Sequence, residues 1–155
     1  MKGNDKIIAT LNDLLTDELT AINQYMVHSE MNANWRYDKL HKAAEARAID
    51  EMKHAEKLIG RILFLEGTPV VTNLKKVHIG ATVDVQHQND TASEVDAVKA
   101  YNAGIRLAVE LGDNGSRELL ESILKDEEDH LDWLEAQTGQ IEQLGLATYL
   151  VEQID

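Results

Sequence analysis

The sequence predicts an all-α protein: a four-helix bundle with one long crossover connection and a short fifth helix at the C-terminus. A single proline occurs in 155 residues. Apolar residues recur at three- and four-residue steps over long stretches, which is the period of an amphipathic α-helix. Turn signals divide these stretches into two pairs, and the segment between the pairs lacks helical periodicity. A chain of this length is one typical domain, so we expect a single domain over residues 1–155.

The first pair of helices is expected at about residues 5–36 and 38–66. A stripe of apolar side chains marks the inner face of the first helix: Ile7, Leu11, Leu14, Leu15, Ile22 and Tyr25. The second helix carries a similar stripe: Ala44, Ala48, Ala55, Leu58, Ile62 and Leu65. Gly67, Thr68 and Pro69 then end it, because glycine and proline commonly follow a helix C-terminus.

Residues 68–82, TPVVTNLKKVHIGAT, are rich in β-branched side chains and show no helical stripe. We interpret them as a connection that crosses the length of the bundle. The second pair of helices is expected at about residues 83–111 and 116–144, with a tight turn at residues 112–115 between them. Gly145 breaks the fourth helix. Residues 146–154 are predicted to form the short fifth helix.

Two antiparallel hairpins joined by one long crossover define a bundle of the ferritin-like type. The first helices, at about 30 residues each, would be roughly 45 Å long. A coiled coil fits less well, because each helix ends within its own cap and turn signals. The fifth helix is too short to be stable alone, so we expect it to pack against something, such as another subunit.

Composition excludes several classes of function. Asp and Glu number 28 against 15 Lys and Arg, for a net charge of −13. This argues against a nucleic-acid binder and against binding to an anionic membrane surface. The chain has no cysteine, which removes disulfides, thiolate metal sites and cysteine nucleophiles. A polar N-terminal segment and the lack of a long apolar run predict a cytoplasmic protein with no membrane span.

Four glutamates fall on the apolar stripes, one on each predicted helix: Glu18, Glu51, Glu94 and Glu127. Glutamate should avoid such positions, because an unpaired buried charge is costly. Two of the four have a histidine three residues further on: His54 and His130. Residues three apart lie within about 60° on one face of a helix, so each pair can point at one ion. The other histidines, His28, His41, His78 and His87, are expected to be ordinary surface or loop residues.

The spacing of these residues repeats between the two halves of the chain. Glu18 and Glu51 are 33 residues apart, as are Glu94 and Glu127, and the halves are offset by 76 residues. A single Glu-x-x-His on an acidic helix is usually a solvated pair, but two hairpins in pseudo-twofold relation would bring all six side chains together. Four carboxylates and two imidazoles suit a pair of divalent ions, with iron or manganese favoured over copper(I) or structural zinc.

The chain closely resembles the bacterioferritin family over essentially its whole length. The residues that carry the resemblance are MKG at the start, DELTAINQY at 17–25, AIDEMKHAEKLIGRILFLEG at 48–67, SRELLESILKDEEDHLDWLE at 116–135 and GLATYL at 145–150. The resemblance implies an iron-storage shell of 24 subunits, built from twofold dimers, with a ferroxidase site in each subunit. It implies that the six residues above are di-iron ligands, with Glu51 and Glu127 as bridges between the ions.

The resemblance also implies a b-type haem shared between two subunits, with Met52 of each as an axial ligand. Helix geometry agrees, since Met52 points away from the metal site, although such a methionine is more often plain interface packing. The family often has an inner-surface iron site at Asp50, whose histidine partner is replaced here by Ala46. Tyr25 is by itself a core aromatic residue, and the resemblance suggests that it lends an electron during oxidation.

The sequence thus predicts a ferroxidase that oxidises Fe(II) with O₂ or H₂O₂ and stores Fe(III) as mineral. A reductase or small ferredoxin would supply electrons for iron release. Two alternatives remain. The first is another di-metal oxidoreductase, such as a manganese catalase, while the absence of cysteine removes a rubrerythrin with a Cys₄ iron domain. The second is a non-catalytic haem or iron carrier.

Overall fold

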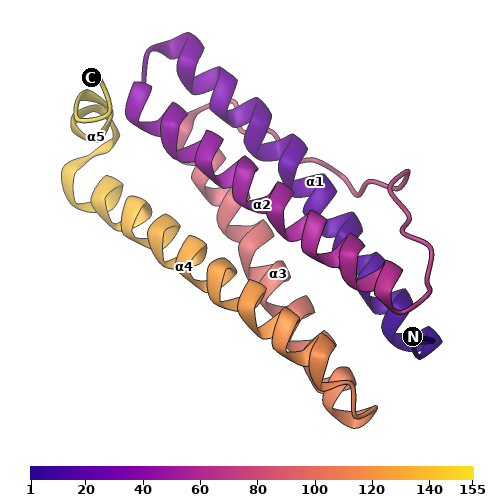
Figure 1. The fold of residues 1–155 in the computed structure, drawn as a ribbon. Helices are drawn as coiled ribbons and strands as arrows, with labels where there is room; N and C mark the ends of the chain where they lie inside the picture. The colour runs from indigo at the N-terminus through magenta and orange to yellow at the C-terminus, as the bar shows by residue number, and fades with distance from the viewer.

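The computed structural model describes residues 1–155 and confirms the predicted fold class. Four long helices form a bundle, and a short fifth helix closes one end of it (Figure 1). No strand is present. None of the helices combines the length and the hydrophobicity that a membrane span requires. The helices are α1 (Asp5–Trp35), α2 (Asp38–Phe64), α3 (Val83–Glu110), α4 (Asn114–Leu144) and α5 (Leu146–Val151).

The helices pack as two hairpins, α1 with α2 and α3 with α4, in the predicted arrangement. The connection between the hairpins, residues 65–82, contains no helix. It runs along the outside of α1 before it enters α3 (Figure 1). We call this segment the crossover.

The ends of the four long helices lie within two residues of their predicted positions. The two-residue difference at the start of α4 has a clear cause. Residues 112–115 were expected to form the turn, but the helix already begins at Asn114 because Asp113 caps it. The Asp113 carboxylate accepts a hydrogen bond from the backbone N–H of Ser116 (3.0 Å), and Arg61 of α2 donates to the same oxygen (2.7 Å). Helix α5 ends at Val151 rather than at residue 154.

The apolar core fills one half of the bundle. Its members come from the first half of α1, the second half of α2, the second half of α3 and the first half of α4. Gly104 lets α3 approach α4 closely there, since a Cβ at this position would lie 3.1 Å from Cδ1 of Leu120 on α4. The fully buried residues of the cluster are Ile7, Leu11, Leu14, Leu15, Ala55, Leu58, Ile62, Leu65, Tyr101, Ala108, Leu120 and Ile123. The four predicted glutamate ligands lie just beyond this core, toward the middle of the bundle.

A ladder of polar side chains on α1 holds the crossover in place. Asn12 accepts a hydrogen bond from the backbone N–H of Val70 (2.8 Å), and Thr20 accepts one from Lys75 (2.9 Å). Further along, the Gln24 side chain accepts from His78 (3.1 Å) and His28 from Gly80 (2.9 Å). These four residues are spaced by multiples of four, so they lie on one face of α1. The crossover therefore has a defined backbone path despite its lack of regular structure.

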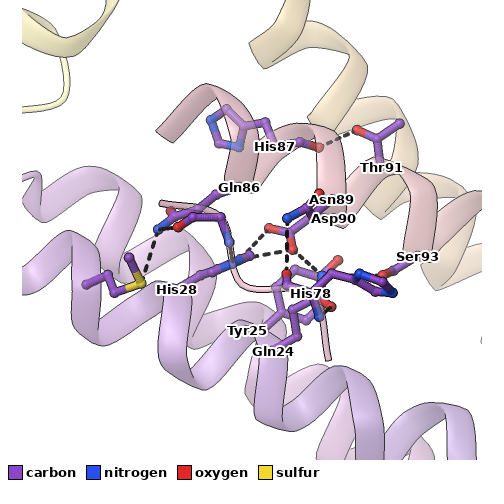
Figure 2. A network of polar contacts seen from close by, with 12 residues as sticks. Gln24, Tyr25, His28, His78, Gln86, His87, Asn89, Asp90, Thr91 and Ser93 are labelled. Carbon is purple, nitrogen blue, oxygen red and sulfur yellow. Dashed lines mark hydrogen bonds and ion pairs between the residues drawn. The ribbon is translucent and has the colours of Figure 1, made fainter. Parts of the chain in front are cut away.

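His28 and His87 are buried, which corrects the expectation of surface or loop positions. His28 lies on α1 with Nδ1 3.0 Å from Oδ1 of Asp90 on α3, and Gln24 donates to the same carboxylate oxygen at 2.8 Å (Figure 2). Because Nε2 of His28 accepts from Gly80, its Nδ1 carries the proton that faces Asp90. The sequence did not show which acid lies opposite His28, so the pair could not be foreseen. His78 lies in the crossover and is exposed, as expected.

Helix α5 packs against the bundle of its own chain, so its apolar face is covered without another subunit. Its Tyr149 is buried against Leu40 and Val83. The Tyr149 hydroxyl donates to Oε1 of Gln137 (2.7 Å) and lies 3.0 Å from Nε2 of His87. The C-terminal segment is also tied to the start of α2 by backbone and side-chain contacts at Lys39 and Lys42. The fifth helix thus closes the end of the bundle opposite the apolar core.

We expect the His87 environment to make folding sensitive to mildly acidic pH. Burial lowers the pKa of the His87 imidazole to about 4. Asp90 and Asp84 on its own helix oppose this shift, whereas His28 on α1 adds to it. As the pH falls below about 6.5, His87 of the unfolded chain binds a proton, whereas His87 of the folded chain stays neutral until about pH 4. Stability from the neutral imidazole is therefore complete above the unfolded pKa and decreases between these two values.

The measurement is urea unfolding of wild type and His87→Gln, followed by circular dichroism at pH 7 and pH 5. The free energy of unfolding of the wild type should fall by about 2 kcal/mol more than that of the variant. Groups elsewhere titrate in both proteins and cancel in the comparison. An equal loss of stability in the two proteins would contradict the prediction.

Candidate metal centre

The structure brings all six predicted ligands into one buried cluster at the middle of the bundle. Their ligand atoms form two groups, and within each group all atoms lie within 4.8 Å of one another. Glu51 and Glu127 belong to both groups, so each could reach two ions. The first group is Glu18, Glu51, His54 and Glu127, and the second is Glu51, Glu94, Glu127 and His130. This is the arrangement that two ions with two bridging carboxylates require.

Both histidine rings turn the same nitrogen toward the carboxylates. His54 Nδ1 lies 2.9 Å from Oε1 of Glu127 and 3.6 Å from Oε2 of Glu18. His130 Nδ1 lies 3.1 Å from Oε1 of Glu51. The two rings are stacked, with centroids 6.1 Å apart. Each imidazole therefore presents one ring nitrogen to the centre of the cluster and leaves the other for a different partner.

That other partner is an aspartate from the opposite hairpin. Nε2 of His54 lies 2.9 Å from Oδ2 of Asp126, and Nε2 of His130 lies 3.4 Å from Oδ2 of Asp50. A carboxylate at the remote nitrogen fixes the tautomer and orientation of a ligating imidazole and increases its basicity. Asp50, which the family resemblance links to an inner-surface iron site, is not among the clustered ligand atoms. Here its carboxylate faces His130 instead.

Two buried tyrosines complete the pseudo-twofold arrangement. The Tyr25 hydroxyl donates to Oε1 of Glu94, and the Tyr101 hydroxyl donates to Oε1 of Glu18. Burial raises the pKa of both phenols well above its ordinary value, so both remain protonated donors. The sequence predicted a role for Tyr25 in the site but none for Tyr101. The 76-residue offset between the halves links the two tyrosines and could have revealed the second.

The electrostatics of the cluster favour a bound cation. Burial raises the pKa of all four glutamates, and it does so strongly for Glu51 and Glu94. Burial alone would lower the pKa of His54, but its contacts with Glu127 and Glu18 raise it. Four ionised carboxylates at this depth are costly unless positive charge accompanies them. Two divalent cations would balance the four charges, and their binding would displace protons from the ligands.

Unpartnered atoms point to the same conclusion. Eight buried side-chain nitrogen and oxygen atoms lack a hydrogen-bond partner, and six of them belong to the six clustered side chains. Buried polar atoms in native proteins are nearly always hydrogen-bonded, so such a concentration needs an explanation. Carboxylate oxygens and imidazole nitrogens aimed at one another are the donor set of a di-iron or di-manganese centre. The residues present therefore fit a pair of such ions.

A cavity of about 440 Å³ connects the cluster with the surface beside α1 and α3. Its inner wall contains the four glutamates. Its outer part is lined by two lysines and a histidine from the crossover and by acidic residues of α1 and α3: Lys75, Lys76, His78, Asp17 and Asp96. The candidate metal centre is therefore buried but has a route to solvent.

Bundle and site together define a ferritin-like protein. Residues 8–144 match the ferritin-like domain family, so the chain belongs to it. More specifically, the chain is a member of the bacterioferritin family. A bacterioferritin of Mycobacterium tuberculosis is 41% identical over 149 residues, which are 96% of this chain and 94% of that protein. Bacterioferritins of Rhodobacter capsulatus (42% over 145 residues, 94% and 90% of the chains) and Streptomyces coelicolor (41% over 155 residues, 100% and 93%) are similar.

The remote aspartates yield a prediction about metal affinity. Asp126→Asn removes the carboxylate that orients His54, and its amide N–H₂ group can stabilise the opposite tautomer. We expect a loss of about 10- to 100-fold in Zn²⁺ affinity, measured by isothermal titration calorimetry. The control is Asp129→Asn, which makes the same change of charge on the exposed side of α4, where Asp129 pairs with Lys125. Equal affinities of the two variants would rule out a role of Asp126 in orienting His54.

Proposed function

We propose that this protein stores iron and is a ferroxidase, with Fe²⁺ as its substrate at the buried cluster. The observation that carries the proposal is the convergence of six unpartnered ligand atoms from four helices on one point. The donor set by itself suits manganese as well as iron, which is what a manganese catalase of the same fold would use. Membership of the bacterioferritin family supports iron, and it favours storage over peroxide disproportionation or a purely passive carrier.

In this proposal each residue has a defined task. Glu18 and His54 hold one Fe²⁺ ion, Glu94 and His130 hold the other, and two glutamates bridge them: Glu51 and Glu127. Dioxygen or hydrogen peroxide accepts the electrons that the two Fe²⁺ ions lose. The carboxylates stabilise the higher charge of the Fe³⁺ product relative to Fe²⁺, which is the direction that the oxidation requires.

The buried phenols support the same chemistry. Tyr25 and Tyr101 hold the outer carboxylates by hydrogen bonds, so these ligands keep their orientation when ions arrive and leave. Tyr25 is also within reach of the centre through Glu94, which suits the family's proposed role of lending an electron during oxidation. An inner-surface iron site at Asp50 remains a prediction, since its carboxylate pairs here with His130.

The Fe³⁺ product would be stored as mineral inside a hollow shell. We propose a homo-oligomer of 24 copies, built from twofold dimers and located in the cytoplasm. Exposed apolar side chains gathered on α1 and α2 support such an assembly, because apolar patches, unlike single exposed residues, mark interfaces: Met26, Val27, Ile49 and Met52.

Met52 fits the role of an axial haem ligand in this assembly. Its side chain is 45% exposed, and Ile49, one helical turn before it, is also exposed. The thioether thus lies on an outer apolar face of α2, where a second copy could present the same residue. Bound haem b would supply a path for electrons, which a reductase or small ferredoxin would deliver for iron release.

The ferroxidase proposal predicts that single ligands are essential. Glu18→Ala and Glu127→Ala should each reduce the initial rate of aerobic Fe²⁺ oxidation by at least about tenfold, since each removes a carboxylate ligand. Stopped-flow absorbance of the ferric product measures the rate. Glu128→Ala is the matched control, because Glu128 is the exposed neighbour of Glu127. Wild-type rates in both ligand variants would refute the assignment, and rapid manganese-dependent peroxide disproportionation without mineral formation would favour the catalase.

The haem assignment is tested separately. Met52→Leu keeps the volume and apolar character of the side chain but removes the sulfur ligand. Titration of the purified shell with haem should give a Soret band of bis-methionine ligation in the wild type and lose it in the variant. Met26→Leu is the control for an exposed methionine on α1. An unchanged Soret band in Met52→Leu would show that Met52 is not the ligand.

A further inference from the structure

The roof of the cavity above the metal centre has a fixed backbone. The roof consists of the crossover residues Lys75, Lys76 and His78. The backbone N–H of Lys75 donates to Thr20, and that of His78 donates to the Gln24 side chain (2.9 and 3.1 Å). Gln24 is itself held by Asp90 (2.8 Å) within the buried network of Figure 2. The backbone of this roof is therefore tied to α1, whereas its two lysine side chains are exposed.

One side chain of the roof forms an ion pair at the mouth of the cavity. The Lys75 ammonium group forms an ion pair with Oδ1 of Asp17, and both residues line the cavity. Asp17 directly precedes the predicted ligand Glu18 on α1. The lysine side chain is 60% exposed and that of Asp17 is 26% exposed. Exposed pairs of this kind contribute little stability, and exposed side chains change rotamer within nanoseconds.

The charge at the mouth gives this pair its significance. A cation that enters this cavity passes the lysines of the crossover, which oppose it. While Lys75 is bound to Asp17, it neutralises a carboxylate at the mouth. When Lys75 swings into solvent, that carboxylate is free to bind the incoming ion one residue before Glu18.

We propose that the Lys75–Asp17 ion pair is a side-chain gate for divalent cations on their way to the metal centre. The gate acts through charge: while the pair is intact, the cavity is open but the Lys75 ammonium group occupies the carboxylate that an entering cation would bind. The gate opens when an arriving cation replaces the ammonium group at Asp17 and then moves on to the glutamates. This inference rests on the proposed function, because it needs a centre that binds cations.

The test measures the rate of Co²⁺ uptake by the assembled protein in stopped-flow absorbance, using the d–d bands of the bound ion. Lys75→Met keeps the apolar stem but removes the charge, and it should accelerate uptake by about threefold to tenfold at low ionic strength. Asp17→Asn removes the receiving carboxylate and leaves the lysine unpaired, so it should slow uptake by a similar factor. Both effects should shrink at about 0.5 M salt, where exposed charges are screened.

The control is Lys125→Met on α4, which removes the same charge from another exposed Lys–Asp pair that does not line the cavity. Its uptake rate should equal that of the wild type. Rates of Lys75→Met and Asp17→Asn that match this control would overturn the gate. Acceleration in both would overturn it as well, because that result indicates a loosened roof rather than a charge gate. Circular dichroism confirms that each variant is folded.

Equilibrium titration with Co²⁺ separates this proposal from the proposed function. Two ions per chain in the wild type, lost in Glu127→Ala, support a working centre, and the uptake rates then decide about the gate alone. Co²⁺ binding that does not depend on Glu127 would overturn both proposals, since the gate would lead to no site.

Discussion

Four carboxylates buried in the middle of one helical bundle are the constraint on which the rest of the structure depends. Each carboxylate would be expelled from an ordinary core, because desolvation of its charge is not compensated by apolar neighbours. The chain instead surrounds them with two imidazoles and two phenols, and each imidazole is in turn oriented by an aspartate from the opposite hairpin. The apolar cluster is confined to one half of the bundle, and polar contacts between α1 and α3 occupy part of the other half. The fold thus keeps the four carboxylates in place, and bound cations would offset the free energy that their desolvation costs.

The two hairpins are related by a pseudo-twofold repeat, but the crossover breaks it. Glutamates, histidines, aspartates and tyrosines all recur at an offset of 76 residues. The polar side chains that bind the crossover lie on α1 and are not repeated on α3, because the crossover runs along the outer side of α1 alone. The cavity therefore opens beside α1 and α3, under that segment. A symmetric pair of ligand sets is served by an asymmetric route to solvent.

Much of this could be predicted from the sequence, since periodicity fixes which residues share a face of a helix. The fold class and the candidate ligands followed from stripes in which Glu18 or Glu127 took the place of an apolar residue. What could not be predicted depends on contacts between helices. The His28–Asp90 pair, the bond from Tyr101 to Glu18 and the aspartates behind the histidines all need the relative register of α1, α2, α3 and α4. Helix α4 starts two residues before the predicted position because Asp113 caps it through Ser116, and Arg61, 52 residues earlier in the sequence, binds the same carboxylate.

The ligand set has a mechanical consequence, because each of the four long helices supplies at least one of the six ligands. Any cation held there ties distant parts of the chain together, much as a disulfide does in proteins that contain cysteine, which this chain lacks. Such a link forms only in the folded state, so the free energy of unfolding rises with the logarithm of cation concentration once the site is saturated. The rigidity of each subunit would then follow the occupancy of its metal centre, and a subunit that holds its cations would be firmer than one that has released them.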